Sequence, residues 1–189
     1  PLKNLNVWGD GGFVLIKKKK FYNKMMLLRN HGLISRNKNQ LFGYNSRLDT
    51  IQAVVALHLL NKIKFITNKR ISNSLYLDKK LSKISSIILK KRKEYLKEVF
   101  HLYEFRVKDK RIRSKLIKFL QKKGIDAKIH YPVPMHLQPA AREFNYKKGD
   151  FPMTELISLT TISLPVHEFI DKKDLNFIIT NIKNFFNES

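Results

Sequence analysis

One lysine near the start of the sequence, Lys3, stands apart from the dense runs of basic residues and lies among apolar and amide side chains. A lysine amine can act as a nucleophile or base only when it is unprotonated for part of the reaction cycle. Burial and a neighbouring cation lower the pKa of a lysine amine, whereas solvation on a surface does much less. Most lysines are solvated surface groups, but the surroundings of Lys3 suit amine chemistry.

A glycine-rich turn and an apolar run follow this lysine. Residues 9–12 read Gly-Asp-Gly-Gly, and residues 13–16 read Phe-Val-Leu-Ile. The apolar run is typical of a short buried strand, so the pattern places Lys3 in a loop that leads through a turn into a core strand. Asp10 could be a reactive carboxylate, but Asp and Gly also tolerate left-handed backbone, which favours a structural role in the turn.

Three further polar motifs follow along the chain. Residues 29–32 read Arg-Asn-His-Gly, residues 43–49 read Gly-Tyr-Asn-Ser-Arg-Leu-Asp with Gln52 and Ala53 after them, and residues 131–139 read Tyr-Pro-Val-Pro-Met-His-Leu-Gln-Pro. With the lysine segment and Ser-Leu-Pro at residues 163–165, these motifs resemble the DegT/DnrJ/StrS family of nucleotide-sugar aminotransferases in register over nearly the whole chain. One such motif is modestly specific, whereas four in register are strong.

The resemblance implies a role for four residues, and the chemistry of a guanidinium suggests a role for a fifth, Arg47. Lys3 would be the catalytic residue that binds pyridoxal 5′-phosphate covalently and then moves a proton between cofactor and substrate. Asn45 would reach across a dimer interface to the cofactor phosphate of the other subunit. Tyr131 and His136 would lie near the nucleotide-sugar substrate, and Arg47 could bind a phosphate or diphosphate through two hydrogen bonds. A lysine at position 3 also argues against the family's dehydratase branch, which has histidine there.

Most of these assignments have a structural alternative. Asn45 could be an ordinary loop residue before a helix, although the N-terminal end of a helix favours anions. Arg47 could form a salt bridge to a partner. The prolines around Val133 stiffen their loop, which could simply cover the core while His136 caps the next helix. His31, beside a glycine, is interpreted as structural.

The resemblance also implies the fold and its division into domains. The fold would be the α/β fold type I of pyridoxal-phosphate-dependent transferases, which is aspartate-aminotransferase-like. Residues 1–66 would form the incomplete end of the large cofactor-binding domain with the start of the connecting helices, and residues 67–189 the connecting helix and small C-terminal α/β domain. The sequence lacks an initiator methionine and starts within a motif that lies mid-protein in the family. We therefore expect a C-terminal fragment that is inactive alone.

Hydrophobic periodicity predicts the elements that would position the motifs, and their order is that of a small α/β layer. Helices are expected over residues 18–30, from a cap at Ser46 onward, over 68–91, 111–123 and 172–186, and opening at 151–155. Alternating apolar residues predict strands over residues 98–107, 125–129 and 160–164. Residues 33–44, which are polar and bounded by glycine, are expected to form a loop.

The charge of the chain does not by itself identify a partner. The 189 residues include 38 Lys and Arg against 15 Asp and Glu, a formal net charge of +23. Such a charge usually indicates a polyanion partner, but these lysines are spread along the chain and do not interleave with aromatic residues as a stacking platform does. We interpret them as solvated helix faces and expect neither nucleic acid nor membrane as a partner. A basic nucleic-acid-binding module and a non-catalytic interaction fragment stay as alternatives.

The remaining composition narrows the expected chemistry. With no cysteine and with six histidines in no ligand spacing, neither disulfide nor metal chemistry is expected. No apolar run approaches the length of a membrane span and no secretory signal is visible, which is compatible with the cytoplasm. The resemblance implies a homodimer that transfers an amino group from glutamate to a keto-sugar linked to a nucleoside diphosphate, for amino-sugar and surface-polysaccharide biosynthesis. The Lys-Asn-Leu spelling at position 3 favours amination at C3 over C4.

Overall fold

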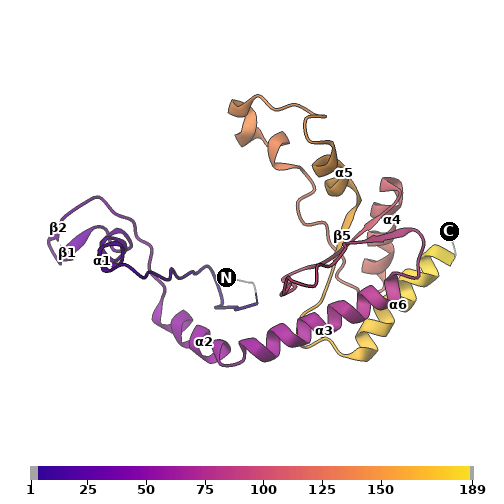
Figure 1. Cartoon of the computed structure of the whole chain (residues 1–189), viewed down its shortest axis with the longest axis horizontal. Helices are drawn as coiled ribbons and strands as arrows, with labels where there is room; N and C mark the ends of the chain where they lie inside the picture. The colour runs from indigo at the N-terminus through magenta and orange to yellow at the C-terminus, as the bar shows by residue number, and fades with distance from the viewer. Residues whose placement is uncertain (1–3, 188–189) are drawn as a thin grey trace. The chain divides into compact units, whose positions relative to one another are not determined.

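The computed structural model describes residues 4–187 and divides the chain into two compact units, residues 1–64 and residues 65–189. Figure 1 shows the helices and strands of both units along the chain. The motifs at residues 29–32 and 43–49 belong to the first unit, and the proline-rich motif at residues 131–139 belongs to the second. Each unit therefore carries part of the expected site.

The first unit contains two helices with a small hairpin between them. Along the chain these are α1 (Lys19–Leu28), the antiparallel strands β1 (Leu33–Ser35) and β2 (Lys38–Asn39), and α2 (Thr50–Leu60). The helix expected near residue 18 is confirmed, but the segment expected to be a loop contains the hairpin. Neither helix has a buried residue, so backbone contacts between segments matter more here than a hydrophobic core.

The start of α2 differs from the prediction. Ser46 was expected to be its N-cap, but the helix begins at Thr50 and Asp49 is the capping residue. Gln52, at the third helical position, completes a capping box by accepting the backbone N–H of Asp49 at 3.4 Å. The assignment of Ser46 was wrong because its backbone N–H donates instead to the carbonyl of Arg29 at 3.0 Å, which holds this residue in an extended segment.

The apolar run at residues 13–16 does not form the buried strand that we expected. Phe13, Val14 and Leu15 are exposed, Leu15 to 89%, and no strand among residues 4–187 pairs with them. A strand is stable only when its backbone N–H and C=O groups find partners in a sheet. The run has the composition of a strand but no such partner in the described part of the chain.

The second unit contains a three-stranded antiparallel sheet in the order β3-β4-β5. Its strands are Ile87–Leu89, Tyr103–Val107 and Thr161–Leu164. The side chains of β4 alternate between the two faces of the sheet: Tyr103, Phe105 and Val107 are buried, whereas Glu104 is exposed. The sheet therefore has one face in the core and one face that is more open.

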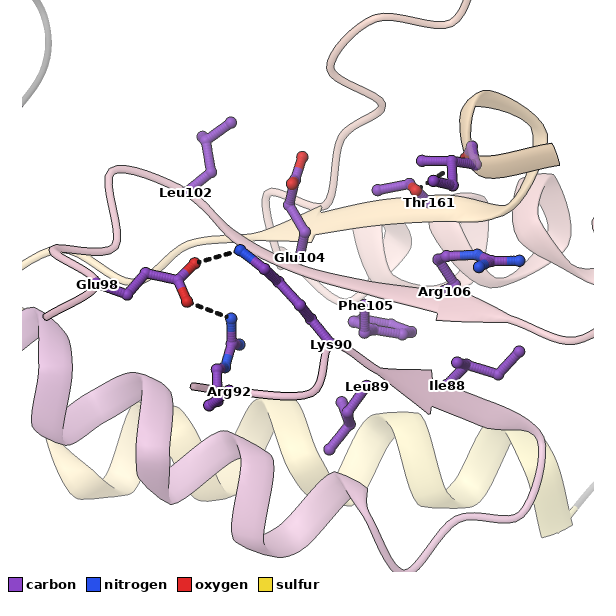
Figure 2. Close-up of a pocket in the computed structure, with 11 residues that line it drawn as sticks. Ile88, Leu89, Lys90, Arg92, Glu98, Leu102, Glu104, Phe105, Arg106 and Thr161 are labelled. Atoms are coloured by element: carbon purple, nitrogen blue, oxygen red, sulfur yellow. Dashed lines mark hydrogen bonds and ion pairs between the residues drawn. The ribbon is translucent and has the colours of Figure 1, made fainter. Parts of the chain in front are cut away.

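Helices cover the buried face of this sheet. They are α3 (Ile63–Leu81), α4 (Lys110–Lys122) and α6 (Lys172–Asn187). Leu77 of α3, Leu116 of α4 and Ile182 of α6 are all fully buried in one hydrophobic cluster with the strand residues. The first and last of these helices run side by side (Figures 1 and 2), and the hydroxyl of Tyr76 donates to Oδ1 of Asn176 between them at 2.7 Å. This packing gives a two-layer α/β unit.

The sequence patterns predicted part of this unit correctly. The helices expected over residues 111–123 and 172–186, the short helix now seen as α5 (Pro152–Thr160) and the strand at residues 160–164 are confirmed. The helix expected over residues 68–91 was wrong at its end: α3 stops at Leu81, where the hydroxyl of Ser82 donates to the carbonyl of Lys79 at 3.2 Å. The apolar residues beyond it join the sheet as β3.

Two predicted strands are shorter than expected. The strand over residues 98–107 is confined to Tyr103–Val107. The strand over residues 125–129 is reduced to a single antiparallel bridge between Lys128 and Ser163. One such bridge is enough to hold an extended segment at the edge of a sheet. The alternation of apolar and polar residues therefore did not distinguish residues 125–129 from a full strand.

Candidate functional site

Lys3, the residue expected to bind the cofactor, lies outside the residues that the structure describes. The turn that follows it is described. Gly9 has a φ of +151°, and Gln52 on the first turn of α2 donates from Nε2 to the carbonyl oxygen of Asp10 at 3.1 Å. A Cβ at Gly9 would lie 3.0 Å from that same Nε2. Asp10 thus helps to fasten the turn to α2 through its backbone.

The Arg-Asn-His-Gly motif and the motif that contains Asn45 meet in the first unit. Asn30 and Asn45 form an isolated antiparallel bridge. Beside it, the backbone N–H of His31 donates to the carbonyl of Tyr44 at 2.9 Å. Two motifs that are separated by a hairpin in the sequence are therefore held together by main-chain hydrogen bonds.

Two glycines allow the two motifs to approach this closely. A Cβ at Gly43 would lie 2.5 Å from the backbone nitrogen of Gly32 and 2.8 Å from the carbonyl oxygen of Leu28. Gly32 has a φ of +72°, and a Cβ there would lie 1.7 Å from the carbonyl oxygen of Leu41. Only glycine fits at both positions, which explains in physical terms why each motif carries one.

Three exposed side chains form a polar cluster on this frame. Arg47 donates from Nε to Oδ1 of Asn45 at 3.0 Å, and its Nη2 lies 3.3 Å from Nε2 of His31. Because the amide oxygen of Asn45 already accepts from Arg47, its Nδ2 group is left to donate to a ligand. The cluster therefore presents an amide donor and a guanidinium on one surface. The sequence favours a structural role for His31. Its place in the Arg-Asn-His-Gly motif is the sequence feature that connects it with the site.

A cavity of about 800 Å³ adjoins this cluster in the first unit. Residues 10–12 of the glycine turn line it together with residues 45–47, and Tyr22 of α1 and Arg29, just after that helix, line it as well. The structure thus brings the turn after Lys3, Asn45 and Arg47 around one hollow. A guanidinium and an amide N–H group suit an anion such as a phosphate.

The other two expected site residues, Tyr131 and His136, lie in the second unit. Tyr131 has a φ of +72° and is 74% exposed, so its phenol is accessible to a ligand. The side chain of His136 is only 7% exposed. Its Nε2 lies 3.1 Å from Oε1 of Glu155 in the first turn of α5, and its ring centroid lies 4.8 Å from that of Phe151. His136 is therefore held by α5, with one ring nitrogen engaged.

Glu155, in the first turn of α5, is a further residue of this site that the sequence motifs do not indicate. Its Oε1 accepts the backbone N–H of Gly149 at 2.7 Å as well as the contact from His136. The hydrogen bond from Gly149, followed by the hydrogen bond and charge of His136, lowers the pKa of the Glu155 carboxyl below its ordinary value. An acidic residue just after Pro152, in a first helical turn, was the only signal in the sequence.

Replacing Glu155 with glutamine should destabilise the second unit in a pH-dependent way. Because the folded chain lowers the pKa of this carboxyl below its ordinary value, the ionised form stabilises the fold at neutral pH, and the stabilisation is lost as the pH falls from the ordinary pKa through the lowered pKa of the folded chain. The difference in thermal unfolding midpoint between the native protein and Glu155→Gln should therefore be largest near about pH 7 and smallest near about pH 3. The exposed Glu94→Gln variant is the control, and a pH-independent difference for Glu155→Gln would contradict the prediction.

A smaller hollow of about 260 Å³ lies on the open face of the sheet in the second unit (Figure 2). Its charged side chains already have partners: Glu98 accepts from Lys90 at 3.2 Å and from Arg92 at 2.9 Å. Arg106 donates from Nε to the hydroxyl of Thr160 at 3.0 Å. Ligand pockets usually exceed about 300 Å³, so this hollow is a weaker candidate than the cavity of the first unit.

Residues 4–187 contain neither a metal-binding cluster nor a helix that could span a membrane. Within that range, no three or more His, Cys, Asp or Glu side chains are grouped in a way that could hold a metal ion. Across the same range, no helix combines the length and the apolar character that crossing a bilayer requires.

Comparison with a solved structure identifies the class of fold. The chain matches the crystal structure of a DegT DnrJ EryC1 StrS aminotransferase from Brucella abortus with a TM-score of 0.87 and 27% sequence identity, over 98% of this chain and 48% of that chain. The fold is therefore the α/β fold type I of pyridoxal-phosphate-dependent transferases, as expected.

Sequence comparison identifies the family within this class. The chain belongs to the DegT/DnrJ/EryC1/StrS aminotransferase family, whose profile matches residues 1–183. It is 28% identical over 98% of its length to a "Pleiotropic regulatory protein" of Geobacillus stearothermophilus, covering 50% of that protein. It is 30% identical, also over 98% of its length, to the dTDP-3-amino-3,4,6-trideoxy-alpha-D-glucose transaminase of Streptomyces venezuelae, covering 48% of it. The chain thus spans about half the length of the curated relatives it matches.

Proposed function

We propose that the whole protein transfers an amino group from glutamate to the keto group of a sugar linked to a nucleoside diphosphate, with pyridoxal 5′-phosphate as cofactor. The observation that carries the proposal is that Lys3, the glycine turn, Asn45 and Arg47 stand in the motifs of a chain that belongs to an aminotransferase family. Relatives support the substrate class, since their names include transaminases of dTDP-linked and UDP-linked sugars.

The donor groups of the first unit suit the phosphate groups of the cofactor and of the substrate. The guanidinium of Arg47 can only donate, and the amide of Asn45 is turned so that Nδ2 is the group left for a ligand. In this proposal Lys3 holds the cofactor covalently, Asn45 binds its phosphate, and Arg47 binds the diphosphate of the substrate. When bound, the cofactor would withdraw electrons from the carbon that loses a proton. The amine of Lys3, released when the amino donor takes its place on the cofactor, would accept and return that proton.

The remaining parts of the proposal concern the substrate and the assembly. Tyr131 contacts the nucleotide-sugar through its exposed phenol, and His136 does so through Nδ1, because Nε2 already faces Glu155. Following the sequence resemblance, we propose a cytoplasmic homodimer in which Asn45 serves the active site of the other subunit. The lysines serve as solvated surface groups, so neither nucleic acid nor a membrane is proposed as a partner.

The decisive experiment incubates the whole protein, loaded with cofactor, with glutamate and a panel of keto-sugar nucleotides. We expect one substrate to give equal amounts of amino-sugar nucleotide and 2-oxoglutarate, detected by mass spectrometry, with 3-keto sugars preferred over 4-keto sugars. Absence of product across both classes of keto-sugar and both dTDP and UDP carriers would refute the proposal. A steeply salt-dependent affinity for duplex DNA in the same preparation would favour the nucleic-acid alternative instead.

A further inference from the structure

We propose that His31 is a positioning residue for phosphate binding. In its neutral form, with the proton on Nδ1, it accepts a hydrogen bond from Arg47 and so fixes Arg47 and Asn45 as donors to a phosphate group. The nature of the ligand rests on the proposed function, whereas the arrangement of the three side chains rests on their geometry alone.

The protonation of His31 follows from its neighbour. Nη2 of Arg47 lies 3.3 Å from Nε2 of His31. A guanidinium nitrogen carries only hydrogens and has no acceptor capacity, so in this contact the imidazole nitrogen must accept. The single proton of a neutral imidazole is then on Nδ1. An imidazolium would instead set an N–H group against an N–H group and place two positive charges in contact.

The backbone around His31 is pinned on both sides. Its N–H donates to the carbonyl of Tyr44 at 2.9 Å, and its own carbonyl accepts from Nδ2 of Asn39 at 2.6 Å. Its φ of +57° lies in the left-handed region, where asparagine, aspartate and histidine are enriched among the residues other than glycine. The backbone therefore accommodates a histidine here, and the contact of the imidazole with Arg47 gives its side chain a role.

The side-chain contacts of Arg47 explain the imidazole. Oδ1 of Asn45 holds Nε, and His31 holds Nη2, so two acceptors on different segments fix the plane of an exposed guanidinium. Nη1 and the second hydrogen of Nη2 are left for a ligand, next to Nδ2 of Asn45. Immobilising such a side chain costs about 0.5–1.5 kcal/mol when it happens during binding. A preset Arg47 avoids that cost.

The first test reads the tautomer directly and does not depend on the proposed activity. In protein labelled with ¹⁵N-histidine, the ring signals of His31, assigned from the spectrum of His31→Gly, should show a protonated Nδ1 and an unprotonated Nε2 at about pH 8, above the ordinary histidine pKa. A protonated Nε2, in either the other tautomer or the imidazolium, would overturn the proposal.

The second test measures binding of inorganic phosphate by calorimetry in a double-mutant cycle. His31→Gly keeps the left-handed backbone but removes the acceptor, and should weaken phosphate binding about 2- to 12-fold, the equivalent of one immobilised side chain. The same change in an Arg47→Ala background should have no further effect, because its target is gone. His31→Asn, which tolerates this backbone and restores an acceptor oxygen, should recover part of the affinity.

The outcomes separate this proposal from the proposed function. Equal losses in both backgrounds, no loss in either, or no phosphate binding by the native protein would each overturn the role of His31. If the predicted tautomer and the non-additive cycle are observed while no keto-sugar is aminated, the positioning role stands and the proposed activity fails. Unchanged thermal unfolding midpoints of the variants show that the effect is on binding and not on folding.

Discussion

Replacing Lys3 with alanine should abolish amino transfer by the whole protein, with kcat lowered by about 10²- to 10⁴-fold, the range for removing a positioned acid–base group. The physical reason is that one amine has two tasks in the proposed reaction, holding the cofactor and moving the proton. Neither task can pass to a methyl group. Steady-state rates with glutamate and the preferred keto-sugar measure the loss.

The control for this variant is Lys20→Ala, which removes an exposed lysine from a dense basic run. It should leave both the rate and the visible absorbance of the bound cofactor unchanged, whereas Lys3→Ala should lose that absorbance. Borohydride treatment of the native protein should attach the cofactor to the peptide that contains Lys3. Attachment at another lysine, or full activity of Lys3→Ala, would contradict the assignment.

Periodicity predicted those elements whose apolar pattern fits only one kind of structure. In α4, Leu116, Ile117 and Leu120 recur at helical spacing and all three are buried. The segment after Leu81 carries isoleucines that fit a helical stripe and a buried strand equally well, and it has no glycine or proline to separate the two. Pairing of Ile87 with Val107 decides the outcome, and such a pairing is not visible in local sequence.

The expected strand at residues 13–16 failed for a related reason. Its composition is right, but a strand is defined by hydrogen bonds to another strand, and the described residues supply none. Local sequence indicates that a segment is suited to a sheet. It does not indicate whether another strand lies close enough in the folded chain to pair with it.

The candidate site was predictable as a set of residues but not as a set of contacts. The motifs named Asn45, Arg47 and Gln52 from their resemblance to a family. That Gln52 reaches the carbonyl of Asp10, 42 positions earlier, and that Arg47 reaches His31, 16 positions earlier, depends on how the segments fold together. Side-chain types give the capacity to donate or accept, whereas the partner is set by tertiary structure.

The largest effect on stability is expected from Asp78→Ala in the second unit, at about 3 kcal/mol. Oδ1 of Asp78 accepts the hydroxyl of Tyr103 at 2.8 Å, and Oδ2 accepts Nε of Arg92 at 3.0 Å. The Tyr103 side chain is fully buried, and burial together with the charge of Asp78 raises the pKa of its phenol. Removing the carboxylate would leave the buried phenol of Tyr103 without its acceptor and the guanidinium of Arg92 with Glu98 as its one remaining carboxylate partner, which costs more than the lost contacts themselves.

Urea unfolding, monitored by circular dichroism, measures the stability of Asp78→Ala and of two matched variants. The comparison separates the effect of removing the Asp78 carboxylate from that of removing an exposed carboxylate. Asp126→Ala breaks a 2.7 Å ion pair with Lys128 in which both side chains are more than half exposed, and should cost less than about 1 kcal/mol. Tyr103→Phe removes only the hydroxyl and should cost about 1 kcal/mol. If Asp78→Ala were no more destabilising than Asp126→Ala, the Asp78 carboxylate would not be holding residues 92 and 103 against α3. The segment between β3 and β4 would then be anchored by its other contacts, which include the hydrogen bonds from Arg70 to the carbonyls of Phe100 and His101.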